Sequence, residues 1–160
     1  MSRPMSRETL IEALSPVLDE LTALDPADAS AAQLHLNSAL PLDDPRIQKI
    51  REAFEQGVEE GWLCDREGGN ARFSRVAKPS PETRGFSIDA VRMSGPGVWH
   101  RHTAGEIELC FARNSGATFD GQPEGWVVYG PGTEHVPTVD GGEMDILYFL
   151  PGGQVEWKKS

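Results

Sequence analysis

Short segments of β-type composition follow one another along the chain after Gly68-Gly69. Each is rich in β-branched or aromatic residues, and each is closed by Gly, Pro, Asn or Asp. The eight segments are Arg72–Ala77, Phe86–Met93, Glu106–Phe111, Ala117–Phe119, Trp126–Tyr129, Val136–Val139, Met144–Leu150 and Val155–Trp157. Because strands that close or double up remove exposed edges, this pattern predicts a mainly β fold, an antiparallel β-barrel or jelly roll.

The chain before these segments has the pattern of helices. Ser6 is placed to cap a first helix that carries a stripe of leucines and ends before Asp25-Pro26. A second short helix is predicted over Ser30–Leu40. Asp44-Pro45 gives the signature of a third helix start, and apolar residues then recur on one face until the helix ends near Gly61.

The chain has 160 residues, so we expect one structural domain, with a helical segment (1–65) packed on a barrel (66–160). Its net charge of -10 argues against nucleic-acid binding, which needs Lys and Arg to neutralise phosphates. No apolar run approaches the roughly 20 residues of a membrane helix, and Met1–Thr9 has no signal core. With only Cys64 and Cys110, the sequence predicts a reduced, cytoplasmic protein.

Three of the four histidines lie in two short segments of the β region. On an ideal strand, residues of equal parity point the same way, so His100, His102 and Glu106 would share one face unless Gly105 interrupts the pleat. Glu108 has that parity too. If the face is the barrel interior, His135 from another strand completes a His3Glu site. Imidazole and carboxylate suit Fe, Mn, Zn, Ni or Cu, so we expect a divalent transition metal of open identity and no organic cofactor.

The pattern His-x-His-x-x-x-Glu, followed roughly thirty residues later by Gly-x-x-His, resembles the two signature motifs of the cupins. Cupins are small β-barrels that carry metal ligands at those positions. The resemblance implies a cupin-like fold and a metal site whose ligands are His100, His102, Glu106 and His135.

A closer resemblance covers most of the chain from about Gly57 onward. The matching stretches are 57–67, 85–89, 105–108, 129–139 and 147–151, and they resemble the 4-hydroxylaminobenzoate lyases. Members of that family convert 4-hydroxylaminobenzoate to 3,4-dihydroxybenzoate (protocatechuate) and ammonium in nitrobenzoate breakdown. The resemblance therefore implies a C–N lyase that acts on a small aromatic carboxylate.

The residues suit that reaction, because an N–O bond breaks more easily once its oxygen is protonated or bound to a Lewis acid. We expect the metal to polarise the hydroxyl or activate water, with Glu108 or Glu134 as a proton carrier. The expected catalytic residues are His102, Glu106, Glu108 and His135. A metal-free variant, in which the same side chains act directly as acids and bases, stays open.

The substrate needs a carboxylate anchor and an aromatic platform. The only basic island of the chain runs from Arg66 to Arg101, and Arg101 is our preferred candidate for the carboxylate. Trp99, Trp126 and Tyr148 are the candidates that stack on the ring.

Two other classes of function use the same ligands. A cupin dioxygenase would activate dioxygen at Fe(II) and consume it. A non-catalytic cupin would bind a small molecule reversibly without forming product. A homodimer is also expected, because cupins commonly pair through strands and helical arms.

Overall fold

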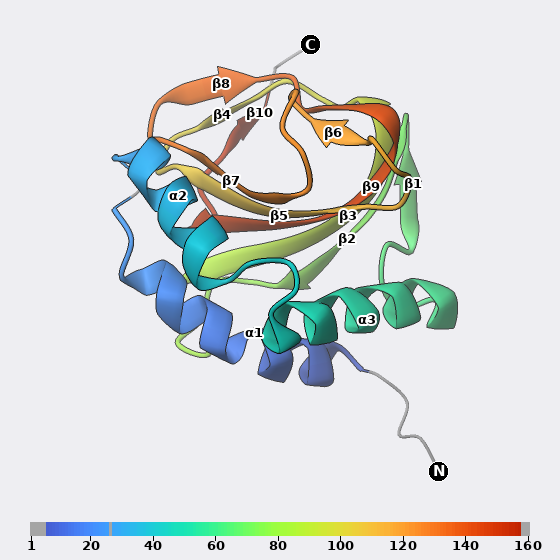
Figure 1. The fold of residues 1–160 in the computed structure, drawn as a ribbon, viewed down its shortest axis with the longest axis horizontal. Helices are drawn as coiled ribbons and strands as arrows, with labels where there is room; N and C mark the ends of the chain where they lie inside the picture. The colour runs from blue at the N-terminus through green and yellow to red at the C-terminus, as the bar shows by residue number, and fades with distance from the viewer. Residues whose placement is uncertain (1–5, 26, 158–160) are drawn as a thin grey trace.

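The computed structural model describes residues 6–25 and 27–157, and Figure 1 shows their arrangement. The described part contains three helices: α1 (Arg7–Thr22), α2 (Ala29–Ala39) and α3 (Pro45–Glu60). The strands all follow them in the chain and form an antiparallel barrel. The predicted fold class is therefore confirmed as mainly β and cupin-like, with helices at the N-terminal end.

The helices begin where capping chemistry places them. The Ser6 hydroxyl accepts a hydrogen bond from the Thr9 N–H at the start of α1, and the Asp44 carboxylate accepts one from the Arg46 N–H at the start of α3. Helix α3 ends at Gly61, whose φ of 84° is the left-handed conformation that glycine adopts readily. The predicted bounds of α2 and α3 agree with the structure to within about one residue.

Ten strands follow within the described residues, and they form two antiparallel sheets. They are β1 (Arg66–Gly68), β2 (Ala71–Ala77), β3 (Phe86–Pro96), β4 (His100–His102), β5 (Glu106–Ala112), β6 (Thr118–Phe119), β7 (Gly125–Tyr129), β8 (Thr133–His135), β9 (Thr138–Pro151) and β10 (Glu156–Trp157). The larger sheet has the order β1-β2-β3-β9-β5-β7, with β6 paired to β9, and the smaller sheet has the order β10-β4-β8. The smaller sheet lies across the barrel from the helices (Figure 1).

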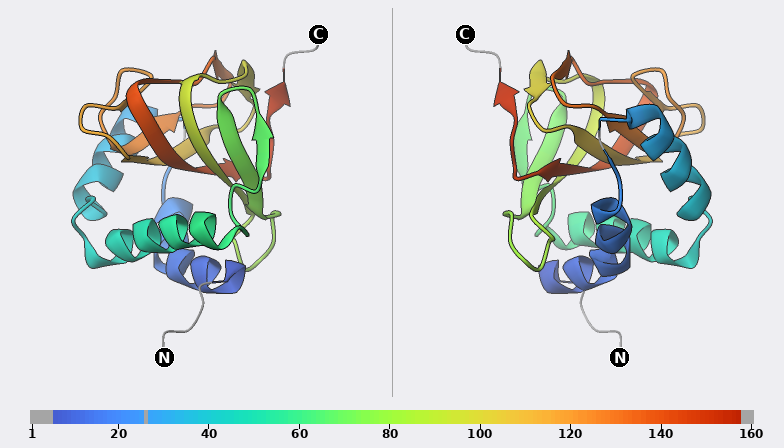
Figure 2. Two further views of the ribbon diagram at one scale, coloured as in Figure 1. Left: turned by 90° about the vertical axis from the view of Figure 1, so that its right-hand side faces the viewer. Right: turned by 90° about the vertical axis from the view of Figure 1, so that its left-hand side faces the viewer.

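The central strands of the larger sheet are buried on both faces. Helices α1 and α3 lie beneath the sheet, and α2 lies at its β7 edge (Figure 2). On the helix side, Ile107 and Leu109 of β5 pack in a core shared with Phe54 of α3. On the other side, Cys110 packs inside the barrel beside Tyr148. Two buried faces explain why β5 and the second half of β9 are apolar without alternation, apart from a few polar residues.

Two details of the predicted strands were wrong. The segment Val136–Val139 is not one strand, because β8 ends at His135 and β9 begins at Thr138. Pro137 lies between the two strands, where a residue without an N–H cannot take part in a ladder. The short strands β1, β4 and β8 were absent from the predicted set, since three residues carry almost no pattern.

No helix in residues 6–25 and 27–157 combines the length and the apolar character needed to cross a membrane.

Candidate metal centre

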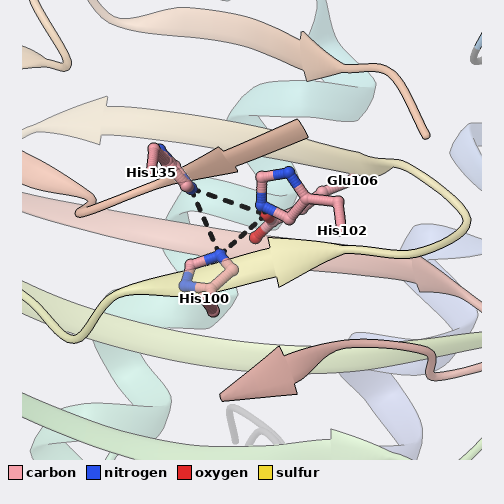
Figure 3. Close-up of side chains that lie close together, drawn as sticks. All are labelled: His100, His102, Glu106 and His135. Carbon is pink, nitrogen blue, oxygen red and sulfur yellow. Dashed lines mark hydrogen bonds and ion pairs between the residues drawn. The ribbon is translucent and has the colours of Figure 1, made fainter. Parts of the chain in front are cut away.

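Three short strands bring the histidine-rich segments together inside the barrel. His100 and His102 lie on β4, Glu106 begins β5, and His135 ends β8 (Figure 3). Strands β4 and β8 pair antiparallel, which places His135 directly opposite His100. Of the two geometries that the sequence allowed from His100 to Glu106, the structure has the one in which Gly105 interrupts the strand. Gly105, with φ of 96°, turns the chain from the smaller sheet into the larger one, so the carboxylate meets the imidazoles from the facing sheet.

The four side chains form one compact cluster. The Glu106 Oε2 atom lies 2.9 Å from His100 Nε2 and 3.7 Å from His135 Nε2, and it also contacts His102 Nε2. The Nε2 atoms of His100 and His135 are 3.2 Å apart. The His100, His102 and Glu106 side chains are at most 4% exposed, while His135 is 12% exposed at the opening. The cluster is thus nearly closed to solvent.

Each histidine uses its Nδ1 atom away from the cluster. His100 Nδ1 lies 3.2 Å from the Val98 carbonyl oxygen, and His135 Nδ1 lies 2.6 Å from Asp120 Oδ2. His102 Nδ1 lies 2.9 Å from the Thr133 hydroxyl, whose own proton is donated to the Gly130 carbonyl. All three partners accept, so each Nδ1 carries a proton that it donates away from the cluster. The three Nε2 atoms therefore face one carboxylate, and each can ligate a metal ion once any proton that it carries is released.

This donor set fits a metal ion. Among the described residues, His102 Nε2 contacts Glu106 Oε2 but has no hydrogen-bond partner, which is costly for a buried polar atom unless a cation satisfies it. Ligand atoms at 2.0–2.1 Å from a tetrahedral ion are about 3.3 Å apart, close to the separation of the His100 and His135 nitrogens. The cluster could hold a transition metal, and nitrogen and oxygen donors leave its identity open.

The electrostatics of the cluster are uneven. Burial opposes the charge on Glu106, but hydrogen bonds from His100 and His135 outweigh it and lower its pKa to about 2. Burial lowers the pKa of His102 to about 4, so this ring is neutral and able to ligate. Burial also opposes the charge on His135, yet hydrogen bonding to Asp120 and Glu106 raises its pKa to about 9. Glu106 is thus ionised and His102 neutral, as a metal site requires, while His135 has to release a proton before it can ligate a metal ion.

Glu108 lies on the inner face of β5, two residues after Glu106. It is 0% exposed, and neither carboxyl oxygen has a hydrogen-bond partner. In the strand register it lies between Val127 of β7 and Tyr148 of β9. Burial, reinforced by the neighbouring Glu106 carboxylate, raises the pKa of Glu108 well above its ordinary value. Glu108 is therefore a neutral acid inside the barrel.

The predicted substrate residues divide between the inner and outer sides of the barrel. Tyr148 is buried inside it, and half-buried Trp99 immediately precedes His100 in the chain. Arg101 is exposed between two buried histidines, so it faces the other side of β4. Trp126 lies on the helix side of the sheet, where its Nε1–H donates to the Leu40 carbonyl. The structure does not bring Arg101 or Trp126 to the cluster.

Two residues beside the cluster were missed in the sequence. Asp120 accepts hydrogen bonds from His135 Nδ1 and from the Tyr129 hydroxyl. The Tyr129 ring stacks on His102 with 5.2 Å between the ring centroids. The Asp120-Gly121 pair carries a tight-turn signal, but nothing in the sequence connects that turn to His135, which is 15 positions away.

The described fold and cluster define a cupin-like barrel with a His3Glu group suited to metal binding. A family model described as PnbB, 4-hydroxylaminobenzoate lyase, matches residues 12–157. The chain belongs to this family.

Two relatives named 4-hydroxylaminobenzoate lyase agree with that assignment. The one from Nocardioides sp. (strain LMS-CY) is 32% identical and covers 98% of this chain and 96% of its own. The one from Pseudomonas putida is 33% identical and covers 76% of this chain and 80% of its own. A solved structure of DMSP lyases covers 96% of this chain and 100% of its own with a TM-score of 0.50, but at 13% identity it supports the fold alone.

Proposed function

We propose that this protein converts 4-hydroxylaminobenzoate to 3,4-dihydroxybenzoate and ammonium, with a divalent transition metal held by His100, His102, Glu106 and His135. The observation that supports the proposal most directly is the convergence of three histidine Nε2 atoms on one buried carboxylate, in a chain of the 4-hydroxylaminobenzoate lyase family. The relatives of that name support the substrate class.

The reaction adds one water overall and needs no oxidant. The N–O bond breaks heterolytically, and its electron pair leaves with the protonated oxygen as water. A second water then adds to the ring carbon next to the nitrogen-bearing carbon. A third hydrolyses the C=N bond that results, ammonia departs, and loss of a ring proton restores aromaticity. The site must therefore supply a proton, activate water and keep the ring in one orientation.

The cluster residues supply the first coordination sphere. A bound metal ion would act as a Lewis acid toward the hydroxylamine oxygen or lower the pKa of a bound water. Glu106 neutralises part of the metal charge and stays ionised, since its pKa is about 2. His102 stays neutral and fixed by Thr133, so its Nε2 lone pair remains directed into the cluster.

Glu108 is our candidate for the acid that protonates the leaving oxygen. Its carboxyl is neutral and lies on the same inner face of β5 as Glu106, two residues further along the strand. Glu134, the other carboxyl considered as a proton carrier, is exposed between Thr133 and His135 on β8. Burial makes Glu108 the better general acid, because its raised pKa lets the carboxyl keep a proton to donate at higher pH than an exposed glutamate can.

The charges also orient the substrate. Glu106 and Asp120 both lie at the cluster, so a substrate carboxylate beside them would meet charges of the same sign. We place the hydroxylamine end toward the cluster and the carboxylate away from it. In this orientation Trp99 and Tyr148 remain the candidates for contact with the ring.

The direct test is turnover of 4-hydroxylaminobenzoate under nitrogen, following 3,4-dihydroxybenzoate and ammonium. We expect both products in equal amounts without oxygen, loss of turnover on chelation and its return with one of Fe, Mn, Zn or Ni. Dioxygen uptake coupled to product would instead support a cupin dioxygenase. Saturable binding without product would support a non-catalytic cupin, and turnover in the metal-depleted protein would show that the side chains act without a metal.

A substitution at the cluster tests the ligand assignment. His102→Ala removes a ligand that is 0% exposed, so we expect loss of bound metal and of turnover together. His35→Ala is the matched control, because His35 lies on α2 with a 52% exposed side chain and bonds only to Glu20. Full turnover of His102→Ala with unchanged metal content would contradict the mechanism.

A further inference from the structure

Asp120 occupies a tight turn that brings its carboxylate to the back of His135. Phe119 and Gln122 exchange two backbone hydrogen bonds of 2.8 Å around the two-residue loop Asp120-Gly121. Both loop residues have positive φ, 50° and 80°, as a type I′ turn requires. Asp-Gly is a favoured sequence for such a turn, which accounts for an aspartate here on local grounds alone.

The contacts of the Asp120 side chain go beyond the needs of the turn. Oδ1 accepts a hydrogen bond of 2.8 Å from the Thr138 N–H on β9. Oδ2 accepts one of 2.6 Å from His135 Nδ1 and another from the Tyr129 hydroxyl. The carboxylate thus meets three donors from three different segments, and each donor needs an acceptor.

The three histidines of the cluster differ in what holds their Nδ1 atoms. The hydrogen-bond partner of Nδ1 is a backbone carbonyl for His100, a hydroxyl for His102 and a carboxylate for His135. Ligating histidines are commonly oriented by such partners, and a carboxylate raises the basicity of the ring most strongly because the hydrogen bond is charge-assisted. His135 is also the most exposed of the cluster side chains, at 12%, so packing restrains it least.

We infer that Asp120 is a positioning residue, which fixes the orientation and the Nδ1–H tautomer of His135 and so keeps the His135 Nε2 lone pair available to a metal. This inference rests on the metal site of the proposed function. It assigns a role outside the first coordination sphere to a residue that touches neither the metal position nor the substrate directly.

Asp120→Asn is the sharpest variant, because asparagine suits the type I′ turn as well as aspartate does. The amide has only one acceptor oxygen for three surrounding donors. If that oxygen stays with the Thr138 N–H, the amide NH2 faces His135 Nδ1. The ring then has to accept at Nδ1 and carry its proton on Nε2, where the proton blocks the metal.

Tyr129→Phe is the matched control. It removes one hydrogen bond to the same Oδ2 atom but keeps the ring that stacks on His102 and leaves the carboxylate facing His135. We expect Asp120→Asn to weaken Zn²⁺ binding by about 10- to 100-fold, measured by competition with a chelator. We expect Tyr129→Phe to leave that affinity unchanged. If Asp120 served only to maintain the fold, the Zn²⁺ affinity would fall in both variants or in neither.

A second readout is independent of metal and activity. In metal-depleted protein with ¹⁵N-labelled histidine, the Nδ1–H of His135 should give a downfield, slowly exchanging proton resonance, assigned by its loss in His135→Gln. It should persist in Tyr129→Phe and disappear in Asp120→Asn. Absence of this resonance from the wild-type protein would overturn the inference, as would unchanged Zn²⁺ affinity in folded Asp120→Asn. Failure of the wild type to bind Zn²⁺ would count against the metal site, and the resonance would then decide the role of Asp120 by itself.

Discussion

Replacement of Glu108 should stabilise the protein while it abolishes catalysis. The carboxyl is fully buried and has no hydrogen-bond partner, so it costs about 1–3 kcal/mol relative to an apolar group of similar size. Glu108→Met is a suitable substitution, because the flexible methionine side chain can fill the space between Val127 and Tyr148. If Glu108 is the general acid, the turnover number should fall by about 10²–10⁴.

The difference in stability between wild type and Glu108→Met should depend on pH. Burial raises the pKa of Glu108 well above its ordinary 4.5, so the native protein holds a proton that the unfolded chain releases above that pH. Unfolding therefore becomes easier as the pH rises, until the native carboxyl itself ionises. The stability advantage of Glu108→Met over wild type should grow by about 1.4 kcal/mol per pH unit in this window. Between pH 5.5 and 6.5, this widens the difference in melting temperature by roughly 3–6 °C.

The assay is thermal unfolding of metal-depleted wild type, Glu108→Met and Glu67→Gln across that pH range, together with anaerobic turnover of the metal-loaded proteins. Glu67 is an exposed glutamate on β1, and its replacement should change neither quantity. A difference in melting temperature that stays constant with pH would show that Glu108 is ionised in the native state. Full turnover of Glu108→Met, with loss of turnover in Glu134→Gln, would show that the acid is Glu134 and refute our choice.

Three further predictions concern packing, backbone and metal. Phe54→Ala on α3 removes a fully buried ring and should cost about 3–5 kcal/mol of unfolding free energy in denaturant titrations, whereas exposed Glu59→Ala should cost almost nothing. Gly61→Ala places a Cβ at φ of 84° with no neighbouring atom within 4 Å, so backbone strain alone should cost about 1–2 kcal/mol in the same titrations. Zn²⁺ at a hundredfold excess over its dissociation constant should stabilise the wild type by about 2.7 kcal/mol, and this gain should vanish in His102→Ala.

The helices and most of the strands followed from the sequence because their signals are local. Asp44-Pro45 and Gly61 mark the two ends of α3 through capping and backbone geometry, which act within one turn. The paired strands β3 and β9 were recognised because each contains β-branched or aromatic residues closed by Gly or Pro. Strands of three residues, such as β4, depend on their partners instead. Its pairing with β8 and β10 is a tertiary property that three residues cannot encode.

At the cluster, the ligands could be predicted from local sequence patterns, whereas the residue that orients His135 could not. The two histidine-rich segments predicted all four cluster members, His135 among them, although His100, His102 and Glu106 meet across a turn rather than along one strand. Asp120 was not predictable, because its sequence signal is fully explained by the turn it forms, and only the pairing of β6 with β9 brings that turn to His135. A ligand must match the chemistry of the ion, which leaves a pattern of residue types. A positioning group only has to accept a hydrogen bond from Nδ1–H at the right place. A carbonyl, a hydroxyl and a carboxylate each do so here. Because three different groups serve one purpose, geometry rather than residue type identifies them.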